Sequence, residues 1–318
     1  MAASPQAFLA SGLDADLPII DAHHHIWDLQ LNYHPWLADE PPQPFRYGDN
    51  RALRRQYLPA DYRHDSAGQN IVASVYMEAE HDPRDLLRET RWIHDIAKQD
   101  GLPQAMAGAA FFDRSDAAEL IRAQASFPLV RSLRHKPAVV ANPRDYDPQH
   151  RLPGSMRCPV WREGYRHLSE NGLHFELQTA WWHLPDALEL ARDFPQTLIV
   201  LNHVGLPADR SEQGLADWRT AMACLSEAPN VRVKLSGFCV PGRRWTPELQ
   251  GWIVHETIRL FGASRCMWAS NFPVDGLVSG FAEILDGMRT ITASLSRRER
   301  LDIFHGTAAR TYRIETAA

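Results

Sequence analysis

The sequence predicts an α/β protein, a (β/α)8 TIM barrel with a long loop insertion after the first strand. Short apolar segments that are bounded by Gly, Pro, Asn or Asp recur along the 318 residues, as buried strands do. Segments with apolar residues at helical spacing separate them. Eight strand–helix units in succession indicate parallel strands joined by helical crossovers. A doubly wound open sheet is the alternative, but it usually carries a glycine-rich turn after its first strand, and "DAHHHIW" stands there instead.

The expected strands are short and apolar, and they lie at residues 18–27, 71–79, 104–112, 129–135, 173–179, 198–205, 231–237 and 266–274. The clearest expected helices lie at 83–101, 115–128, 184–195 and 246–262. Thr246 is a suitable N-cap for the last of these, because Pro247 follows it at the first helical position. We expect one domain over 1–318, with an N-terminal extension at 1–17. The polar, Pro-rich insertion at 28–66 should cover the barrel mouth.

Composition excludes several classes of protein. The net charge is −5 with both signs spread along the chain, so no basic stripe for nucleic acid is present. No apolar run is long enough to span a bilayer, and the N-terminus does not resemble a signal peptide. The four cysteines lie far apart and form no CxxC pair, which favours buried, reduced thiols. We therefore expect a cytoplasmic protein with no nucleic-acid or membrane partner.

The stretch "PIIDAHHHIWD" places three histidines at the end of the first strand. Side chains alternate along a strand, so His23 and His25 share a face and His24 takes the other. Barrel enzymes keep their chemistry at the C-terminal ends of the strands. Two imidazoles there can converge on one metal ion at about 2 Å. We expect His24 to be a bystander.

Other strand ends also carry polar side chains. These are Glu78, Arg131 and Arg134, Gln178, Asn202 and His203, Lys234 and Ser236, and Ser270, Asn271 and Asp275. By alternation, Arg131 lies on the face opposite Arg134. Trp36 in the insertion is a candidate wall of the pocket. Polar groups at so many strand ends are hard to explain by solvation of the rim alone, and they predict an active site at the mouth.

Five motifs occur in a fixed order: "IIDAHHHIWD", "LNHVGLP", "VKLSG", "RCMWASNFPVD" and "FHGTAARTYRI". Together they resemble the amidohydrolase-2 family, which is part of the amidohydrolase superfamily of TIM-barrel hydrolases. The resemblance is to the branch of sugar-lactone and pyrone-dicarboxylate lactonases. It runs from about Pro18 to Ile314.

The resemblance implies hydrolysis of a small cyclic ester, and it implies metal ligands at His23, His25 and His203. Two positions depart from the superfamily pattern. Gln178 ends the fifth strand, where a ligand histidine is usual, and Asn271 replaces the aspartate of the eighth strand. An amide cannot accept a proton from water. The base could instead be Glu78, Asp275, an imidazole of the cluster, or a hydroxide on a divalent metal such as Zn or Mn. Some lactonases of this branch need no metal, so both routes stay open.

The function expected from these residues is the opening of a small anionic lactone, a sugar-acid or dicarboxylate lactone, by water. The expected catalytic residues are Glu78, His203, Asn271 and Asp275. The expected substrate-binding residues are Arg131, Arg134, Gln178, Lys234 and Trp36. A decarboxylase or an amide hydrolase of the same superfamily, and a barrel that only binds a ligand, remain as alternatives. The expected partner is a small-molecule substrate, and homo-oligomers are common among barrel enzymes.

Overall fold

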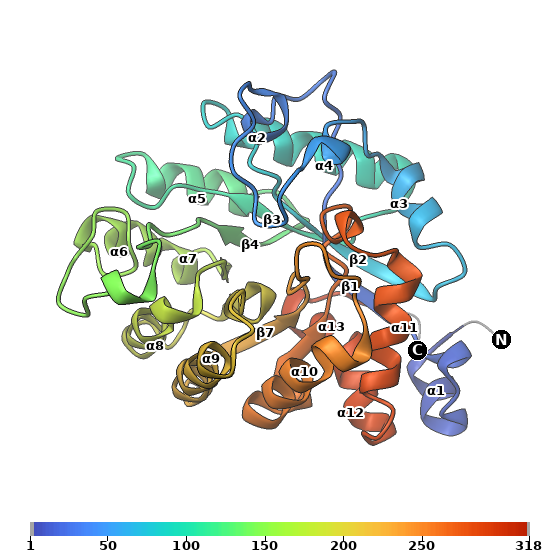
Figure 1. The fold of residues 1–318 in the computed structure, drawn as a ribbon. Coiled ribbons are helices and arrows are strands. Elements are labelled where there is room, and N and C mark those ends of the chain that lie inside the picture. The colour runs from blue at the N-terminus through green and yellow to red at the C-terminus, as the bar shows by residue number, and fades with distance from the viewer. Residues whose placement is uncertain (1–2, 317–318) are drawn as a thin grey trace.

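Eight parallel strands, paired in sequence order, form a nearly closed barrel in the computed structural model, which describes residues 3–316. The predicted TIM barrel is therefore confirmed (Figure 1). The strands are β1 (Ile19–His24), β2 (Ile71–Met77), β3 (Ala105–Ala109), β4 (Val130–Arg134), β5 (His174–Leu177), β6 (Ile199–Leu201), β7 (Val231–Leu235) and β8 (Cys266–Trp268). Each lies inside its predicted segment.

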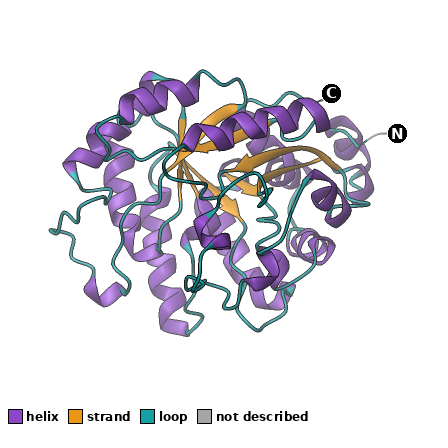
Figure 2. Cartoon of the chain, turned by 90° about the horizontal axis from the view of Figure 1, so that it is seen from above, coloured by secondary structure: helices purple, strands orange, loops and turns teal. Residues whose placement is uncertain are grey.

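Helices surround the strands on the outside, as the view from above shows (Figure 2). They are α1 (Pro5–Ser11), α2 (Pro35–Ala38), α3 (Pro59–Asp65), α4 (Leu86–Asp100), α5 (Ala117–Ala125), α6 (Pro159–Tyr165), α7 (His167–Glu170), α8 (Leu184–Asp193), α9 (Glu212–Ser226), α10 (Pro247–Phe261), α11 (Phe281–Ile291), α12 (Arg297–Leu301) and α13 (Thr307–Tyr312). Thr246 caps α10 as predicted, because its side chain accepts the Leu249 N–H. No helix in the described part of the chain is both long and apolar enough to cross a membrane.

The barrel closes between β1 and the segment that follows β8. The Asn271 N–H donates to the His23 carbonyl at 2.7 Å, and the His25 N–H donates to the Phe272 carbonyl at 2.8 Å. The buried Asp21 carboxylate reinforces this seam, because it accepts bonds from the Ser270 N–H and hydroxyl at 2.8 and 2.6 Å. The seam thus brings the two ends of the barrel sequence together at the mouth.

The insertion at 28–66 contains α2 and α3, and its residues line the cavity at the barrel mouth. Trp36 and Phe45 stack within it, with ring centroids 5.7 Å apart. Tyr47 anchors it to the barrel by donating to Asp275 at 3.0 Å. The segment is therefore packed against the mouth rather than free in solvent.

The four cysteines are free thiols, and three of them are buried as expected. Cys224 is exposed, which corrects the expectation for that residue. It lies on α9, near the end of that surface helix, which explains its exposure.

Candidate active site

The paired histidines of β1 converge at the mouth. The register of β1 on β2 shifts between Asp21 and His24, and such irregularities re-aim side chains. His23 Nε2 and His25 Nε2 lie 3.3 Å apart, and His25 donates its Nδ1–H to the Met77 carbonyl at 2.9 Å. This bond fixes the tautomer of His25 and leaves its Nε2 as an acceptor. His24 points away, where it bonds the Ser74 hydroxyl at 3.0 Å, as expected for a bystander.

His203 completes the histidine cluster from the segment after β6. Its ring centroid lies 4.7 Å from that of His23, and its Nδ1 lies 3.0 Å from the Ser236 hydroxyl. His203 has a φ of 56°, a conformation that non-glycine residues rarely adopt. The ring is also closely packed, since a Cβ at Gly237 would lie 2.2 Å from Nδ1. Left-handed backbone also occurs at Glu80 and Asn271, so strained residues gather around the mouth.

The electrostatic environment keeps the three imidazoles neutral. Burial lowers the pKa of His23 well below its usual value, and the cationic Lys234 lowers it further. Burial also lowers the pKa of His25, and the cationic Arg134 lowers it further. Burial lowers the pKa of His203 as well, and there Arg46 adds to the shift. Near neutral pH each ring therefore offers one donor and one acceptor.

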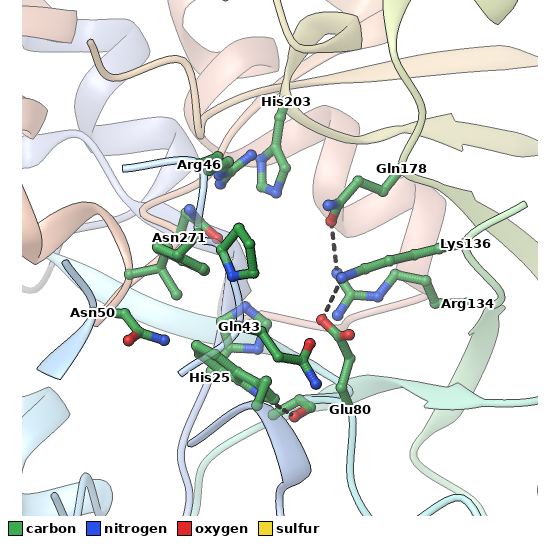
Figure 3. Close-up of a pocket in the computed structure, with 15 residues that line it drawn as sticks. His25, Gln43, Arg46, Asn50, Glu80, Arg134, Lys136, Gln178, His203 and Asn271 are labelled. Atoms are coloured by element: carbon green, nitrogen blue, oxygen red, sulfur yellow. Dashed lines mark hydrogen bonds and ion pairs between the residues drawn. The ribbon is translucent and has the colours of Figure 1, made fainter. Parts of the chain in front are cut away.

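A cavity of about 230 Å³ opens beside these rings, and we call it the mouth cavity (Figure 3). Of the predicted site residues, it is lined by His25, His203, Arg134, Gln178, Asn271 and Trp36. Three cationic side chains (Arg46, Arg134 and Lys136) and one carboxylate (Glu80) line it as well. The mouth cavity therefore has an excess of positive charge.

Arg134 is held at the cavity wall by Glu78. Its Nε donates to Glu78 Oε1, and its Nη1 lies 3.4 Å from Gln178 Oε1. The second carboxylate oxygen of Glu78 accepts the Glu80 N–H at 2.8 Å. Glu78 does not line the mouth cavity. Both of its oxygens are thus engaged in positioning other groups.

Asp275 is buried behind Asn271. Its Oδ1 accepts the Asn271 amide at 2.6 Å and the Tyr47 hydroxyl at 3.0 Å, while its Oδ2 accepts the Gly237 N–H at 3.0 Å. Burial raises the pKa of Asp275, although Arg46 opposes that shift. Asp275 is absent from the cavity lining, so its contacts indicate that it orients Asn271.

Two expected substrate-binding residues lie elsewhere, and these expectations are corrected. Arg131 points to the N-terminal end of the barrel, where its guanidinium donates to the carbonyls of Pro128 and, at 2.9 Å, of Tyr312. Arg131 lies at the start of β4, and alternation puts its side chain on the face opposite Arg134. Lys234 is fully buried below the mouth cavity, and it forms an ion pair with Glu176 at 2.9 Å. Neither residue lines the cavity.

Sequence reasoning missed five polar residues of the cavity: Gln43, Arg46 and Asn50 from the insertion, and Glu80 and Lys136 beyond the ends of β2 and β4. Arg46 lies beside His203 in Figure 3, and its Nη1 is buried with no hydrogen-bond partner in residues 3–316. An irregular insertion has no periodicity from which to infer a direction. A basic residue flanked by aromatic ones, as in "PFRYG", was the available signal.

The histidines at the mouth supply part of a binding site for a divalent metal. The 3.3 Å between His23 Nε2 and His25 Nε2 suits two nitrogens that each lie about 2 Å from one ion. The bond from His25 to the Met77 carbonyl is typical of a ligand histidine. However, no group of three His, Cys, Asp or Glu side chains within 3–316 is arranged to hold an ion. The neutral amide of Asn271 and the guanidinium beside His203 do not complete the donor set.

The fold and the polar cavity at the strand ends define a TIM-barrel protein whose mouth is built as an enzyme active site. Residues 20–314 match the amidohydrolase family, and the chain belongs to that family. This confirms the resemblance found in the sequence motifs.

Two relatives align along nearly the whole chain. A protein of Sinorhizobium fredii designated y4mH is 37% identical over 94% of this chain and 100% of its own length. An L-fucono-1,5-lactonase of Burkholderia ambifaria is 28% identical over 93% of this chain and 96% of its own.

Solved structures share the fold. An amidohydrolase from Burkholderia multivorans with bound zinc has a TM-score of 0.76 at 24% identity, covering 94% of this chain and 100% of its own. A probable 2-pyrone-4,6-dicarboxylic acid hydrolase from Acinetobacter baumannii with bound citric acid has a TM-score of 0.67 at 12% identity, covering 93% and 99%. A 5-carboxyvanillate decarboxylase from Sphingomonas paucimobilis has a TM-score of 0.63 at 14% identity, covering 94% and 100%.

Proposed function

We propose that this protein is a hydrolase that opens a small anionic lactone by adding water to its carbonyl carbon. The observation that carries the proposal is the juxtaposition of a neutral imidazole cluster with three cationic side chains in one cavity. The L-fucono-1,5-lactonase relative supports the same reaction class.

In the proposed mechanism, His25 is the general base. Its Nδ1–H is held by the Met77 carbonyl, so its Nε2 carries the lone pair. In the proposal the attacking water replaces the long 3.3 Å contact between this Nε2 and His23 Nε2 and gives its proton to His25. Glu78 and Asp275 are less suitable, because their oxygens are engaged in the wall. They act as positioning residues for Arg134 and Asn271. Because Asn271 stands in place of the strand-eight aspartate, we assign the role of base from the contacts of the remaining candidates.

His203 and Arg46 stabilise the developing oxyanion in this proposal. In the tautomer that this role requires, the Ser236 hydroxyl donates to His203 Nδ1 and leaves an Nε2–H for the substrate, while Arg46 adds an unpaired guanidinium nearby. When the tetrahedral intermediate collapses, the ring oxygen leaves and takes the proton from His25. The product is one hydroxy acid. Its carboxylate, and any acidic group already on the substrate, faces Arg134 and Lys136.

A divalent ion, as in the zinc-bound neighbour, would be held here by His23 and His25. No step of the proposed reaction depends on it, since the donor set is incomplete. The test is hydrolysis of sugar-acid and dicarboxylate lactones, followed by a pH indicator, with and without prior chelation. Turnover that survives chelation supports the imidazole base, and turnover lost on chelation and restored by Zn or Mn assigns the base role to a metal-bound hydroxide. No turnover on any lactone would contradict the proposal.

Decarboxylation of a small aromatic acid is a second candidate, because the cationic lining of the mouth cavity would bind a carboxylate equally well. The decarboxylase among the structural neighbours shares only the fold. Release of CO2 from aromatic acids, measured alongside the lactone panel, separates the two reactions.

A further inference from the structure

A second cavity of about 260 Å³ lies against the mouth cavity, and we call it the side chamber. It is lined by Trp36, His81, Leu86, Ala109, Phe111 and Lys136, among others. Neither cavity alone reaches the roughly 300 Å³ that is usual for a ligand pocket, but the two joined would exceed it. The proposed mechanism places no part of the substrate in the side chamber.

The partition between the two cavities is thin. Trp36, Gln43, Glu80, Arg134 and Lys136 line both cavities, so they form the shared wall. The ion pair between Lys136 and Glu80 crosses this wall (Figure 3). The two side chains are 36% and 50% exposed, and ion pairs that accessible contribute little stability. A ligand can therefore displace this pair at small cost.

His81 shows what the side chamber is built to bind. It is only 4% exposed, and neither of its ring nitrogens has a hydrogen-bond partner among residues 3–316. Its neighbour His34 is held by a bond from Nδ1 to the Ala79 carbonyl at 2.9 Å, so the two buried rings differ in this respect. Leaving buried polar atoms unpaired is costly. Burial lowers the pKa of His81, so its ring is neutral and offers one donor and one acceptor, as a hydroxyl group requires.

The other walls define the remaining chemistry. Leu86, Ala109, Phe111 and Trp36 present apolar and aromatic surface suited to a ring. The charges that line the side chamber balance, since the carboxylates of Glu78 and Glu80 line it together with Arg134 and Lys136, whereas Glu78 does not line the mouth cavity. The unpaired Arg46 lines only the mouth cavity. The side chamber therefore favours an uncharged group.

We propose that the two cavities form one substrate site, in which the side chamber holds an uncharged, hydroxyl-bearing ring attached to the lactone. The substrate is thus a two-ring molecule, a lactone that carries a glycosyl or hydroxyphenyl substituent. The proposal rests on the proposed function for the lactone half only.

Calorimetric binding of product acids tests the side chamber without requiring catalysis. Gluconate and lactobionate form one pair, in which lactobionate adds a galactosyl ring. The opened acids of γ-valerolactone and of dihydroxyphenyl-γ-valerolactone form the aryl pair. We expect the ring-bearing acid of one pair to bind at least tenfold more tightly than its partner, about 1.4 kcal/mol. The pair that shows this preference identifies the substituent as glycosyl or aryl. Equal affinities within both pairs would overturn the proposal.

Two variants locate the preference in the chamber. His81→Phe removes the hydrogen-bonding ring, and Ala109→Leu fills the space. Each should bring the affinity ratio close to one, with folding verified by circular dichroism. His174→Phe is the matched control, because His174 is a histidine with a buried, unpartnered Nδ1 at the opposite end of the barrel, and it should keep the ratio. A ratio that survives both chamber variants would place the second ring elsewhere.

Hydrolysis of gluconolactone by the wild type is measured separately. Failure there with a retained binding preference would reject the lactonase and leave the two-ring site. Normal hydrolysis without a binding preference for the ring-bearing acids would reject the two-ring site and leave the lactonase proposal standing.

Discussion

The floor and the mouth of this barrel are built from the same strands, yet the floor carboxylate Glu176 and the mouth guanidinium Arg46 differ in how the protein satisfies them. On the floor, Glu176 pairs with Lys234 at 2.9 Å and accepts bonds from Tyr312 at 2.6 Å and Asn202 at 2.7 Å. At the mouth, His23 Nδ1 and Arg46 Nη1 are buried without a partner in residues 3–316. Buried polar groups are normally paired. The floor carboxylate is thus satisfied by the protein, whereas the mouth leaves groups free for a ligand.

The largest effect should come from the mouth. His203→Ala should lower kcat/KM for lactone hydrolysis by about 10²–10⁴-fold, the range of a lost proton-transfer or oxyanion group. Tyr312→Phe is the matched floor variant, because it removes one bond to Glu176 and touches no cavity residue. It should change kcat/KM only a few-fold. Comparable losses in both variants would erase the distinction between the two regions.

The floor should control stability. Glu176→Gln leaves Lys234 as a buried charge without its carboxylate and should lower the free energy of unfolding by about 3–5 kcal/mol. Adding Lys234→Met should restore much of this loss. Urea unfolding measures both. A loss below about 1 kcal/mol in the single variant would show that the ion pair is dispensable.

Arg46→Met tests the unpaired cation of the mouth. Losing a hydrogen bond to a charged group costs about 1.5–3 kcal/mol, so kcat/KM for lactone hydrolysis should fall roughly 10–150-fold, mainly through kcat. KM is the control and should change less, because the oxyanion forms only in the transition state. The free energy of unfolding should not fall, since no buried partner is abandoned. A stability loss like that of Glu176→Gln would mean that Arg46 is structural.

Asn271→Asp introduces a carboxylate where the amide now donates to Asp275 at 2.6 Å. Burial already raises the pKa of Asp275, and a second carboxylate beside it raises that pKa further, so the pair should share a proton near neutral pH. We expect kcat/KM to fall roughly tenfold at pH 8, where the pair loses this proton and the two carboxylates repel, and to recover on acidification. A gain in rate at pH 8 would show that the amide limits catalysis.

The two regions should respond alike to acid. Burial lowers the pKa of His34, near the mouth, and of His174, at the floor end, to about 4. Between pH 6.5 and 4 the unfolded chain binds more protons, so stability is complete above 6.5 and falls with pH by up to about 1.4 kcal/mol per unit for each histidine. Urea midpoints across this range should be less steep in His34→Gln and in His174→Gln. An unchanged slope in either would contradict the shift at that residue.

The barrel was predictable because strand alternation and strand ends are local properties of the sequence. His23, His25 and Arg134 were placed correctly by these rules. Lys234 was not, because its partner Glu176 lies inside another strand, and only register brings the two side chains together. The engaged oxygens of Glu78 and Asp275 depend on backbone N–H groups whose direction no pattern encodes. Arg46 lies in an irregular insertion, where the sequence offers no period.

The seam described above has a consequence for the time course of synthesis. The Asn271 N–H donates to the His23 carbonyl across this seam, so His23 cannot make this hydrogen bond until Asn271 has been synthesised. Ribosomes add about 5–20 residues per second, which leaves the first strand without its last neighbour for roughly ten seconds or more. During that interval the histidine pair exists without the rest of the mouth. The nascent chain can acquire a working site only when translation is nearly complete.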